Sequence, residues 1–329
     1  MAACWSKEGV ELASSDDEEL MIRAAWMYYH HDMTPDQIAK RLHTSRVKIT
    51  RILQKAREVG VVEISISRPL PINLQLSDQL ERSFDLKEAV IVPSKPDFVD
   101  TLEEIGRATA DYLVHITFPG CRLGFAWSST LSRLAAYLKA PSSHVPCTVT
   151  DLAGSMLGQD NPYIVSARVG QVFGAPIRPL LVPAVLNTQA IRDVIMSEPS
   201  VQAALELASK SDIAFLGLGD AGPNSTMVRT GYLSADDLAD LRARGAVGDL
   251  LIRYFDIHGR HIPHPIDQRI IGLNWEELRR IPRLVIVAAG PLKIPPILGI
   301  LRSGLCSTLI TDTNTAQAVI NAANSPALS

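Results

Sequence analysis

The chain has 329 residues, of which 47% are hydrophobic and 20% charged, and its formal net charge is −3. This composition predicts a soluble globular protein with a real core, and the length predicts two domains. The sequence contains no apolar run of roughly 18 residues that would span a membrane, no secretion signal within residues 1–19, and no CxxC pair among its four cysteines. We therefore expect a cytoplasmic protein with reduced thiols and with no bound metal or other cofactor.

Charge is distributed unevenly over the first sixty residues. Residues 1–19 hold one lysine against six acids, whereas residues 34–58 hold seven bases against two acids. A basic block in an acidic chain indicates a polyanion as the partner of that block, although an ordinary solvated face has the same composition. We expect residues 1–16 to be disordered.

Three helices are predicted next. The first covers residues 17–31, and a break follows it. Thr34 then begins a Thr-Pro-Asp-Gln segment that is typical of a capping box, with a short helix over 35–42. After a tight turn, Ser45 is the expected cap of a further helix that runs to about residue 59. Two short helices joined by such a turn form a helix-turn-helix unit, whose second helix enters the major groove of DNA.

The outer face of the second helix of this unit carries groups that suit DNA. Arg46 and Arg51 can each donate two hydrogen bonds to guanine, and Val47 can contact a thymine methyl group. Hydroxyl and lysine side chains nearby suit phosphate contacts. The expected DNA-binding residues are Thr34, Thr44, Ser45, Arg46, Val47, Lys48, Thr50, Arg51 and Lys55. A helical hairpin with a basic face and no DNA-binding role is the alternative interpretation.

A boundary follows the helix-turn-helix unit. Apolar and polar side chains alternate over residues 60–68 as they do in a β-strand, which predicts a wing beside the helices. A Pro-Leu-Pro segment at 69–71 then ends that strand. Residues 73–84 predict a helix that either connects two domains or serves in oligomerisation. We therefore expect a helix-turn-helix domain over 1–68, a linker helix over 69–84 and an effector-binding domain over 85–329.

In the larger domain, strand-length apolar runs alternate with amphipathic helical segments. This alternation predicts an α/β fold with a mainly parallel sheet that is covered on both faces. An antiparallel hairpin over 247–262, with its turn at His258 and Gly259, is expected as an insertion. The predicted strands are 89–92, 122–126, 148–152, 177–182, 213–217, 284–288 and 308–311, and the predicted helices are 102–117, 131–138, 164–173, 191–208 and 294–301.

Ligands of such sheets bind at the carboxyl ends of the strands, so the residues after each strand are the candidates. Gly124 is followed by Trp127-Ser128-Ser129-Thr130 before a helix, which is a possible anion cradle or a simple helix cap. Gly219 and Gly290 also follow strands, and Lys293 beside Gly290 is either a phosphate ligand or a surface lysine. Asp249 suits sugar hydroxyls or stabilises the hairpin. His258, His261 and His264 have no cysteine partner, so they do not predict a zinc site.

The order of these segments resembles the SorC/DeoR-type sugar-responsive regulators, the SorC family, over nearly the whole chain. Residues 23–62 are similar to the family's helix-turn-helix, with Met33-Thr34, Gln37-Ile38-Ala39 and Ser45-Arg46 in matching order. Four further segments are similar to its effector domain. They are Asp212-Ile-Ala-Phe-Leu-Gly-Leu-Gly219, Gly245-Ala-Val-Gly-Asp249, Ile271-Gly-Leu273 and Leu309-Ile-Thr-Asp-Thr-Asn-Thr-Ala316.

The resemblance implies an effector domain related in fold to glucosamine-6-phosphate deaminase and ribose-5-phosphate isomerase. It also implies a phosphorylated sugar or polyol as effector, operator DNA as partner, and a homo-oligomer, usually a tetramer. The effector-binding residues that it implies are Gly124, Trp127, Ser128, Ser129, Thr130, Gly154, Gly219, Asp249, Gly290 and Lys293. The family's A-G-G-x-x-K stretch departs here, because Ala289 stands for its first glycine and prolines crowd the following helix start.

Two other functions fit parts of this pattern. The large domain could be a sugar-phosphate isomerase or deaminase joined to a DNA-binding domain, but no acid/base pair is evident, so no catalytic residue is predicted. The chain could also be an architectural DNA-binding protein without a ligand, but such a protein would need no large α/β domain. A regulator of a carbohydrate or polyol catabolic operon is the function that the sequence favours.

Overall fold

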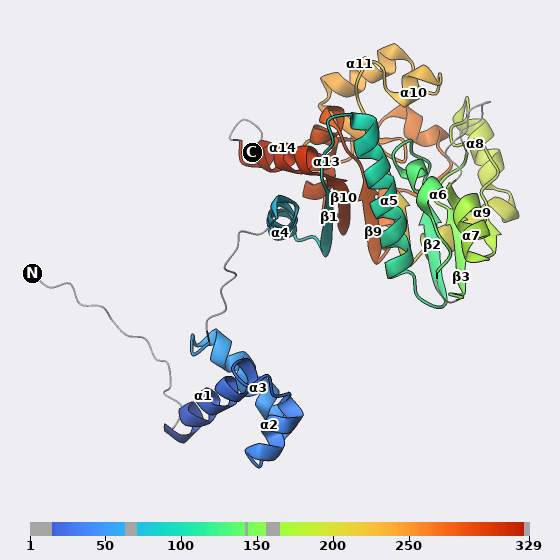
Figure 1. Cartoon of the computed structure of the whole chain (residues 1–329). Coiled ribbons are helices and arrows are strands. Elements are labelled where there is room, and N and C mark those ends of the chain that lie inside the picture. The colour runs from blue at the N-terminus through green and yellow to red at the C-terminus, as the bar shows by residue number, and fades with distance from the viewer. Residues whose placement is uncertain (1–14, 63–70, 142–143, 156–164, 326–329) are drawn as a thin grey trace, which may run out of the picture. The chain divides into compact units, whose positions relative to one another are not determined.

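The computed structural model describes residues 15–62, 71–141, 144–155 and 165–325. The chain divides into two compact units, Met1–Leu70 and Pro71–Ser329, which are described separately (Figure 1). No helix within the described residues is both long enough and apolar enough to cross a membrane.

The smaller unit contains three helices, α1 (Ser15–Tyr29), α2 (Pro35–Arg41) and α3 (Arg46–Glu58). Their apolar faces meet in one core, because each helix places its apolar side chains on a single stripe. The fully buried members of that core are Ala24, Ile38, Ile49 and Ala56. The three helices match the predicted ones within one or two residues. Residues 1–14 and most of the predicted wing, 63–68, lie outside the described residues.

The larger unit is built on a seven-stranded sheet in which every paired strand is parallel, in the order β1-β10-β9-β5-β2-β3-β4. Each of the seven strands overlaps one of the seven predicted ones, and β4 is shorter than predicted. They are β1 (Glu88–Val92), β2 (Cys121–Phe125), β3 (Cys147–Asp151), β4 (Ile177–Arg178), β5 (Ile213–Leu216), β9 (Arg283–Val287) and β10 (Thr308–Asp312). Successive strands run outward from β2 to β4, and the next strand, β5, pairs on the other side of β2. The strand order therefore reverses between β2 and β5.

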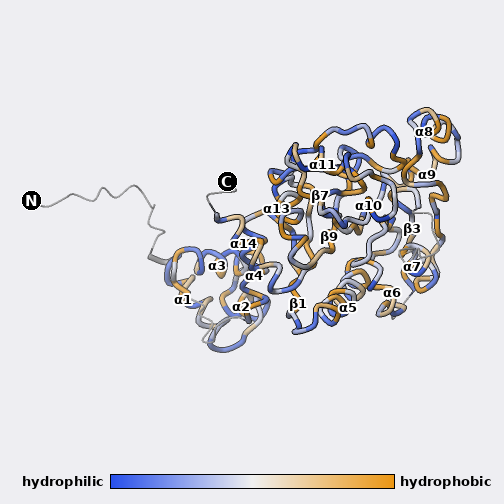
Figure 2. The backbone as a smooth tube through the Cα atoms, turned by 90° about the horizontal axis from the view of Figure 1, so that it is seen from above, coloured by the Kyte–Doolittle hydropathy of each residue, from blue (hydrophilic) through white to orange (hydrophobic). Residues whose placement is uncertain are grey.

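Helices cover both faces of this sheet, and the strand side chains alternate between the two layers. In β9, Leu284 and Ile286 belong to one core cluster, and Val285 and Val287 belong to the other. Helices α5 (Phe98–Ile116), α6 (Leu134–Tyr137) and α7 (Val165–Phe173) cover the second cluster. In Figure 2, α5 and α6 lie on one side of β9 and α13 lies on the other. The opposite layer contains α4 (Ile72–Phe84), α9 (Pro199–Ser209), α12 (Trp275–Arg279), α13 (Ile294–Arg302) and α14 (Thr313–Ala323).

A second sheet follows β5 in the chain and is antiparallel, in the order β6-β7-β8. Its strands are β6 (Gly219–Asp220), β7 (Ala246–Leu250) and β8 (Arg253–Asp256), and it packs with α10 (Thr226–Arg229), α11 (Ala235–Ala243) and the 3₁₀-helix η2 (Pro265–Arg269) around a third core cluster. The sequence predicted one antiparallel hairpin over 247–262 with its turn at His258 and Gly259. That turn is present and joins β8 to His261, but an earlier turn between β7 and β8 was not predicted.

The β7–β8 turn is formed by Leu251 and Ile252, which both adopt positive φ, 49° and 68°. Asn and Gly usually occupy such positions, so a Leu-Ile pair gives no turn signal in the sequence. His258 and Gly259 form a later turn, after which His261 bridges back to Phe255.

Three further elements differ from the sequence-based expectation. The fourth strand ends at Arg178 rather than at residue 182. The helical segment 191–208 is two helices, α8 (Gln189–Met196) and α9, because Pro199 begins a new helix. The helix expected as a linker is α4, which packs on β1 and α14 and buries Leu76 and Leu80 in the larger unit.

Candidate functional site

The two helices of the helix-turn-helix are fixed by the caps that the sequence predicted. The Thr34 hydroxyl accepts a hydrogen bond from the Gln37 N–H (3.4 Å), and the Gln37 side chain accepts one from the Thr34 N–H (2.8 Å). Ser45 caps α3 by accepting from the Lys48 N–H (3.2 Å). Between the helices, His43 takes a positive φ of 50° and closes the turn. These contacts set α3 at a defined angle to α2 and leave its outer face free of the core.

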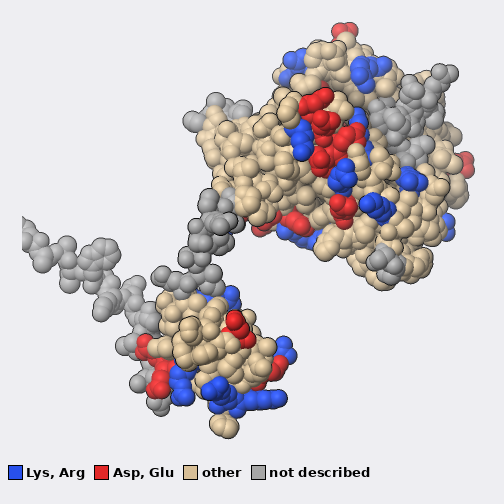
Figure 3. All heavy atoms as spheres, viewed as in Figure 1, with Lys and Arg blue, Asp and Glu red and all other residues tan. Residues whose placement is uncertain are grey.

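That outer face is exposed and basic. All nine residues expected at DNA are exposed except Thr44, which is half-buried, and Val47 is 66% exposed. Figure 3 shows Lys and Arg side chains gathered along one side of the smaller unit. The second helix of a helix-turn-helix unit enters the major groove of DNA. Because the outer face of α3 is exposed, it can approach a duplex without any rearrangement of the core.

Four of the expected DNA-binding side chains also have partners inside the unit. The Thr34 and Ser45 hydroxyls serve as caps, and Thr50 donates to the Arg46 carbonyl (3.0 Å). The Arg46 guanidinium lies 3.7 Å from the Asp36 carboxylate, with both side chains more than half exposed. Such an exposed pair is weak, so Arg46 remains available to a stronger acceptor.

The larger unit contains a pocket at the carboxyl ends of β2 and β5, where the strand order reverses. Such a switch point is the usual ligand site of an open parallel sheet. The empty space of the pocket, including the part open to solvent, is about 640 Å³. Its lining consists of residues 126–129, 217–220 and 225–227 with Asp249, Leu251 and Lys293.

Glycines allow the segments around this pocket to approach closely. A Cβ atom on Gly217 would lie 2.1 Å from the Ser128 hydroxyl oxygen, and one on Gly219 would lie 1.7 Å from the Asp249 carboxylate. Both positions therefore require glycine, and through them the segments that follow β2, β5 and β7 come together at one point.

Asp249 is the most buried charged group of the pocket, at 7% exposure. Its Oδ2 accepts a hydrogen bond from the Ile252 N–H (2.9 Å) across the β7–β8 turn. Burial raises the pKa of this carboxyl to about 6, against the opposing effects of the Ile252 N–H and the Lys293 ammonium. A β-branched residue at positive φ is rare and costs energy, and here the Ile252 N–H that it presents fixes the Asp249 carboxylate.

Lys293 lies in the pocket wall, in the 3₁₀-helix η3 (Pro291–Lys293), and pairs with Asp220 of β6. Its Nζ donates to the Asp220 Oδ2 at 2.9 Å, and the two side chains are 21% and 18% exposed. Burial acts to raise the pKa of Asp220, but the Lys293 charge and the Gly222 N–H outweigh it and hold that pKa below its ordinary value. The pocket therefore presents an ammonium that is already occupied by a carboxylate.

The pocket brings together six of the ten residues expected at the effector. Trp127, Ser128, Ser129, Gly219, Asp249 and Lys293 line it. The other four have different surroundings. Gly124 faces Leu152 and Ser211 inside the sheet. The Gly154 carbonyl accepts a hydrogen bond from the Trp127 indole N–H (3.0 Å), so it orients a pocket residue. Gly290 adopts φ +100° and donates to Thr315, and Thr130 begins the 3₁₀-helix η1 (Leu131–Arg133).

Sequence reasoning missed several lining residues. Asp220 was not among the expected effector-binding residues, although it pairs with Lys293 in the pocket wall. Ser225, Thr226 and Met227 follow a loop with no strand or motif to signal them. The Ser225 hydroxyl is buried and has no hydrogen-bond partner among the described residues. It lies in the lining, where a ligand hydroxyl or phosphate oxygen can bind it.

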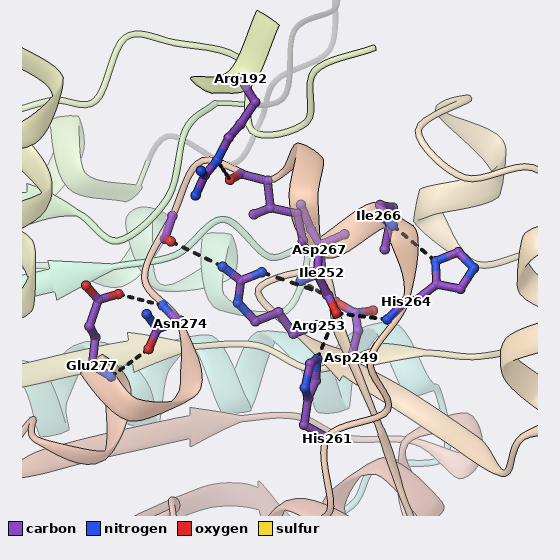
Figure 4. A network of polar contacts seen from close by, with 12 residues as sticks. Arg192, Asp249, Ile252, Arg253, His261, His264, Ile266, Asp267, Asn274 and Glu277 are labelled. Atoms are coloured by element: carbon purple, nitrogen blue, oxygen red, sulfur yellow. Dashed lines mark hydrogen bonds and ion pairs between the residues drawn. The ribbon is translucent and has the colours of Figure 1, made fainter. Parts of the chain in front are cut away.

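Arg253, the residue that follows the β7–β8 turn, belongs to a second network of polar contacts. Arg253 is 7% exposed, donates to the Gly272 carbonyl (3.5 Å) and lies 3.9 Å from Asp267, which also pairs with His261 (3.1 Å) (Figure 4). His264 caps η2 through its ring nitrogen. These histidines therefore have structural partners, and no group of His, Cys, Asp and Glu able to hold a metal occurs among the described residues.

The chain is similar to known proteins along most of its length. A family model described as "Putative sugar-binding domain" matches residues 69–321. The deoxyribonucleoside regulator of Bacillus subtilis is 30% identical over 312 residues, which cover 93% of this chain and 98% of that protein. The sorbitol operon regulator of Klebsiella pneumoniae is 28% identical over 320 residues, which cover 94% and 100%.

Solved structures resemble the chain as well. The crystal structure of the full-length sorbitol operon regulator SorC from Klebsiella pneumoniae matches with a TM-score of 0.72 at 27% identity. The match covers 93% of this chain and all of that one. A sugar-binding domain of a transcriptional repressor from Vibrio fischeri matches with a TM-score of 0.68 at 25% identity, over 77% of this chain. The Bacillus and Klebsiella relatives are named as regulators, and neither is named as an enzyme.

Proposed function

The chain belongs to the SorC/DeoR family of sugar-binding transcriptional regulators, and we propose that it controls a carbohydrate or polyol catabolic operon in response to a phosphorylated sugar or polyol. In this proposal the smaller unit binds operator DNA and the pocket of the larger unit binds the effector. The observation that carries it is the presence of both in one chain: an exposed basic recognition helix, and a pocket at the sheet's switch point that holds Asp249 and Lys293.

In the DNA-binding half, α3 lies in the major groove. Arg46, Val47 and Arg51 contact base edges. The flanking residues Thr34, Thr44, Ser45, Lys48, Thr50 and Lys55 contact phosphates. The exposure of this face and the two caps that orient α2 and α3 support the assignment.

In the effector half, Lys293 and the hydroxyls of Ser128, Ser129 and Ser225 bind the phosphate, and Asp249 accepts hydrogen bonds from sugar hydroxyls. A buried carboxylate suits that task, because its second oxygen is free to accept while the Ile252 N–H holds the first. Trp127, held by the Gly154 carbonyl, provides an apolar wall for the carbon chain. Gly124, Thr130, Gly219 and Gly290 shape the segments that carry these groups.

Two further points complete the proposal. The protein acts in the cytoplasm, where operator DNA is found. It also acts as a homo-oligomer, because two copies are needed to contact the two halves of a palindromic operator. The resemblance to the family implies a tetramer.

The experiment begins by selecting the operator from random duplex DNA with the purified full-length protein. Fluorescence anisotropy then measures operator affinity while sugar and polyol phosphates are titrated. We expect one such compound to change operator affinity at least tenfold, and Lys293→Gln to abolish that response while binding the operator as the wild-type protein does. If no phosphorylated compound alters operator affinity or is bound, the effector half of the proposal fails. Turnover of a compound would instead favour an enzyme.

A further inference from the structure

The charged groups of the effector pocket do not form a simple anion site. The ionisable side chains that line it are Asp220, Asp249 and Lys293, which are two acids against one base. A phosphate group that enters therefore meets a pocket whose own charge is negative when both acids are ionised. This negative charge opposes the binding of a phosphate dianion unless one of the two carboxylates is displaced.

Asp220 is the carboxylate that occupies the contact with Lys293 that we propose for the effector's phosphate. Its Oδ2 accepts from the Lys293 Nζ at 2.9 Å. Its Oδ1 accepts from the Gly222 N–H at 3.0 Å, which fixes the carboxylate on β6 beside the ammonium. Both side chains of the pair are about four-fifths buried, so solvent screens the attraction only in part. Lys293 thus has an internal anion as its partner before any ligand binds.

We propose that Asp220 is a selectivity residue of the effector pocket, an internal anion that competes with the effector's phosphate for Lys293. The inference rests on the proposed function, since it concerns the same site and the same phosphate. A phosphate ester gains the Lys293 contact only by breaking the Lys293–Asp220 pair. An uncharged polyol can bind through Asp249 and Ser225 and leave that pair intact.

A positioning role for Asp220 predicts the opposite change in phosphate affinity. If Asp220 only positioned the lysine for the ligand, its removal would weaken phosphate binding. If it competes, its removal strengthens phosphate binding. The direction of the change in affinity therefore separates the two roles.

The decisive variant is Asp220→Asn, which removes the charge and keeps an oxygen that can accept from the Gly222 N–H. Glu206→Gln is the matched control, because it also removes one acid paired to a lysine (Glu206–Lys210, 2.6 Å) but on the exposed surface of α9. Lys293→Gln removes the ammonium. Titration calorimetry on the full-length proteins uses inorganic phosphate, glucitol 6-phosphate and glucitol at constant ionic strength, and thermal melting shows that each variant is folded.

We expect Asp220→Asn to bind inorganic phosphate and glucitol 6-phosphate about tenfold more tightly than the wild-type protein, with glucitol unaffected. Glu206→Gln should bind all three compounds as the wild-type protein does. Lys293→Gln should lose the part of the affinity that depends on the phosphate group. Equal or weaker phosphate binding by Asp220→Asn overturns the competition. If the wild-type protein binds phosphate through Lys293 while Asp220→Asn is unchanged, only this inference fails. If even Asp220→Asn binds no phosphate, both this inference and the phosphorylated effector fail.

Discussion

The helix-turn-helix and the effector pocket differ in how their functional side chains are brought together. On the smaller unit, the expected DNA-binding residues lie on α3 and at the positions just before α2 and α3, and each helix start is set by its own neighbours. In the larger unit, the pocket collects residues that follow β2, β5, β7 and β9. Local signals therefore decide the geometry of the first site, and the order of strands in the sheet decides that of the second. Substitutions in each unit test this difference, beginning with those that should cost the most.

The boundary between the two units is tested at α4. Leu80 is fully buried in the core of the larger unit, so Leu80→Ala should lower that unit's stability by about 2–5 kcal/mol. Leu74, on the same helix, is 50% exposed and provides the control, for which Leu74→Ala should cost under about 1 kcal/mol. Urea denaturation of the full-length variants measures both. Equal costs would mean that α4 is a linker rather than a part of this core.

The parts of the fold that the sequence predicted are those with a strong local pattern. The parallel strands were predicted because most of them are short apolar runs that are buried on both faces, whereas β4, with only Ile177 and Arg178, is the exception. The capping box at Thr34, the cap at Ser45 and the turn of the helix-turn-helix were predicted because Thr34 and Ser45 have a fixed spacing to the residues that they cap. The helix α4 was also found, but its amphipathic pattern does not reveal which surface covers its apolar face.

The pocket was predicted less completely for a physical reason. Glycines and hydroxyls after strands indicated Ser128, Gly219 and Lys293, but no local pattern could pair Lys293 with Asp220, since strand order alone brings them together. The β7–β8 turn was missed because Leu251 and Ile252 adopt a backbone conformation that their side chains disfavour. The first miss concerns long-range packing and the second an unusual local conformation, and both lie at the pocket.

Burial of Asp249 makes the stability of the larger unit depend on pH. Its pKa is about 6, above the ordinary value of 3.8, so the folded state holds this proton more tightly than the unfolded state does. The stabilising contribution is therefore present below about pH 4 and is lost as the pH rises through 6, by about 3 kcal/mol in all. Asp249→Asn should remove this loss.

The measurement compares urea denaturation of the wild-type protein and Asp249→Asn from pH 4.5 to pH 7.5 without effector. Other acids contribute equally to both proteins, so the difference between the two curves isolates this carboxyl. We expect the variant to gain stability relative to the wild-type protein as the pH rises. A difference that stays constant with pH would mean that Asp249 titrates near its ordinary value, as an exposed carboxyl does.

On the recognition helix, base contacts and phosphate contacts should respond differently to substitution. Arg46→Ala and Arg51→Ala should each weaken operator binding by about 1–3 kcal/mol and relax the base preference at one position. Lys55→Ala should weaken binding to all sequences alike and reduce the salt dependence. Anisotropy titrations with the operator and with single-base variants, at two salt concentrations, provide both readouts. If the arginine variants bind the operator as the wild-type protein does, the recognition surface does not lie on this face of α3.

The smallest effect concerns the cap of α3, where one side chain serves both folding and the proposed DNA contact. Ser45→Ala removes the acceptor for the Lys48 N–H and should cost the smaller unit about 1 kcal/mol. Ser45→Asp restores a cap of equal strength and should recover that stability. It also places a negative charge where we propose a DNA phosphate, so it should bind DNA more weakly than Ser45→Ala does. If Ser45→Asp binds DNA as the wild-type protein does, the start of α3 does not face the phosphate backbone.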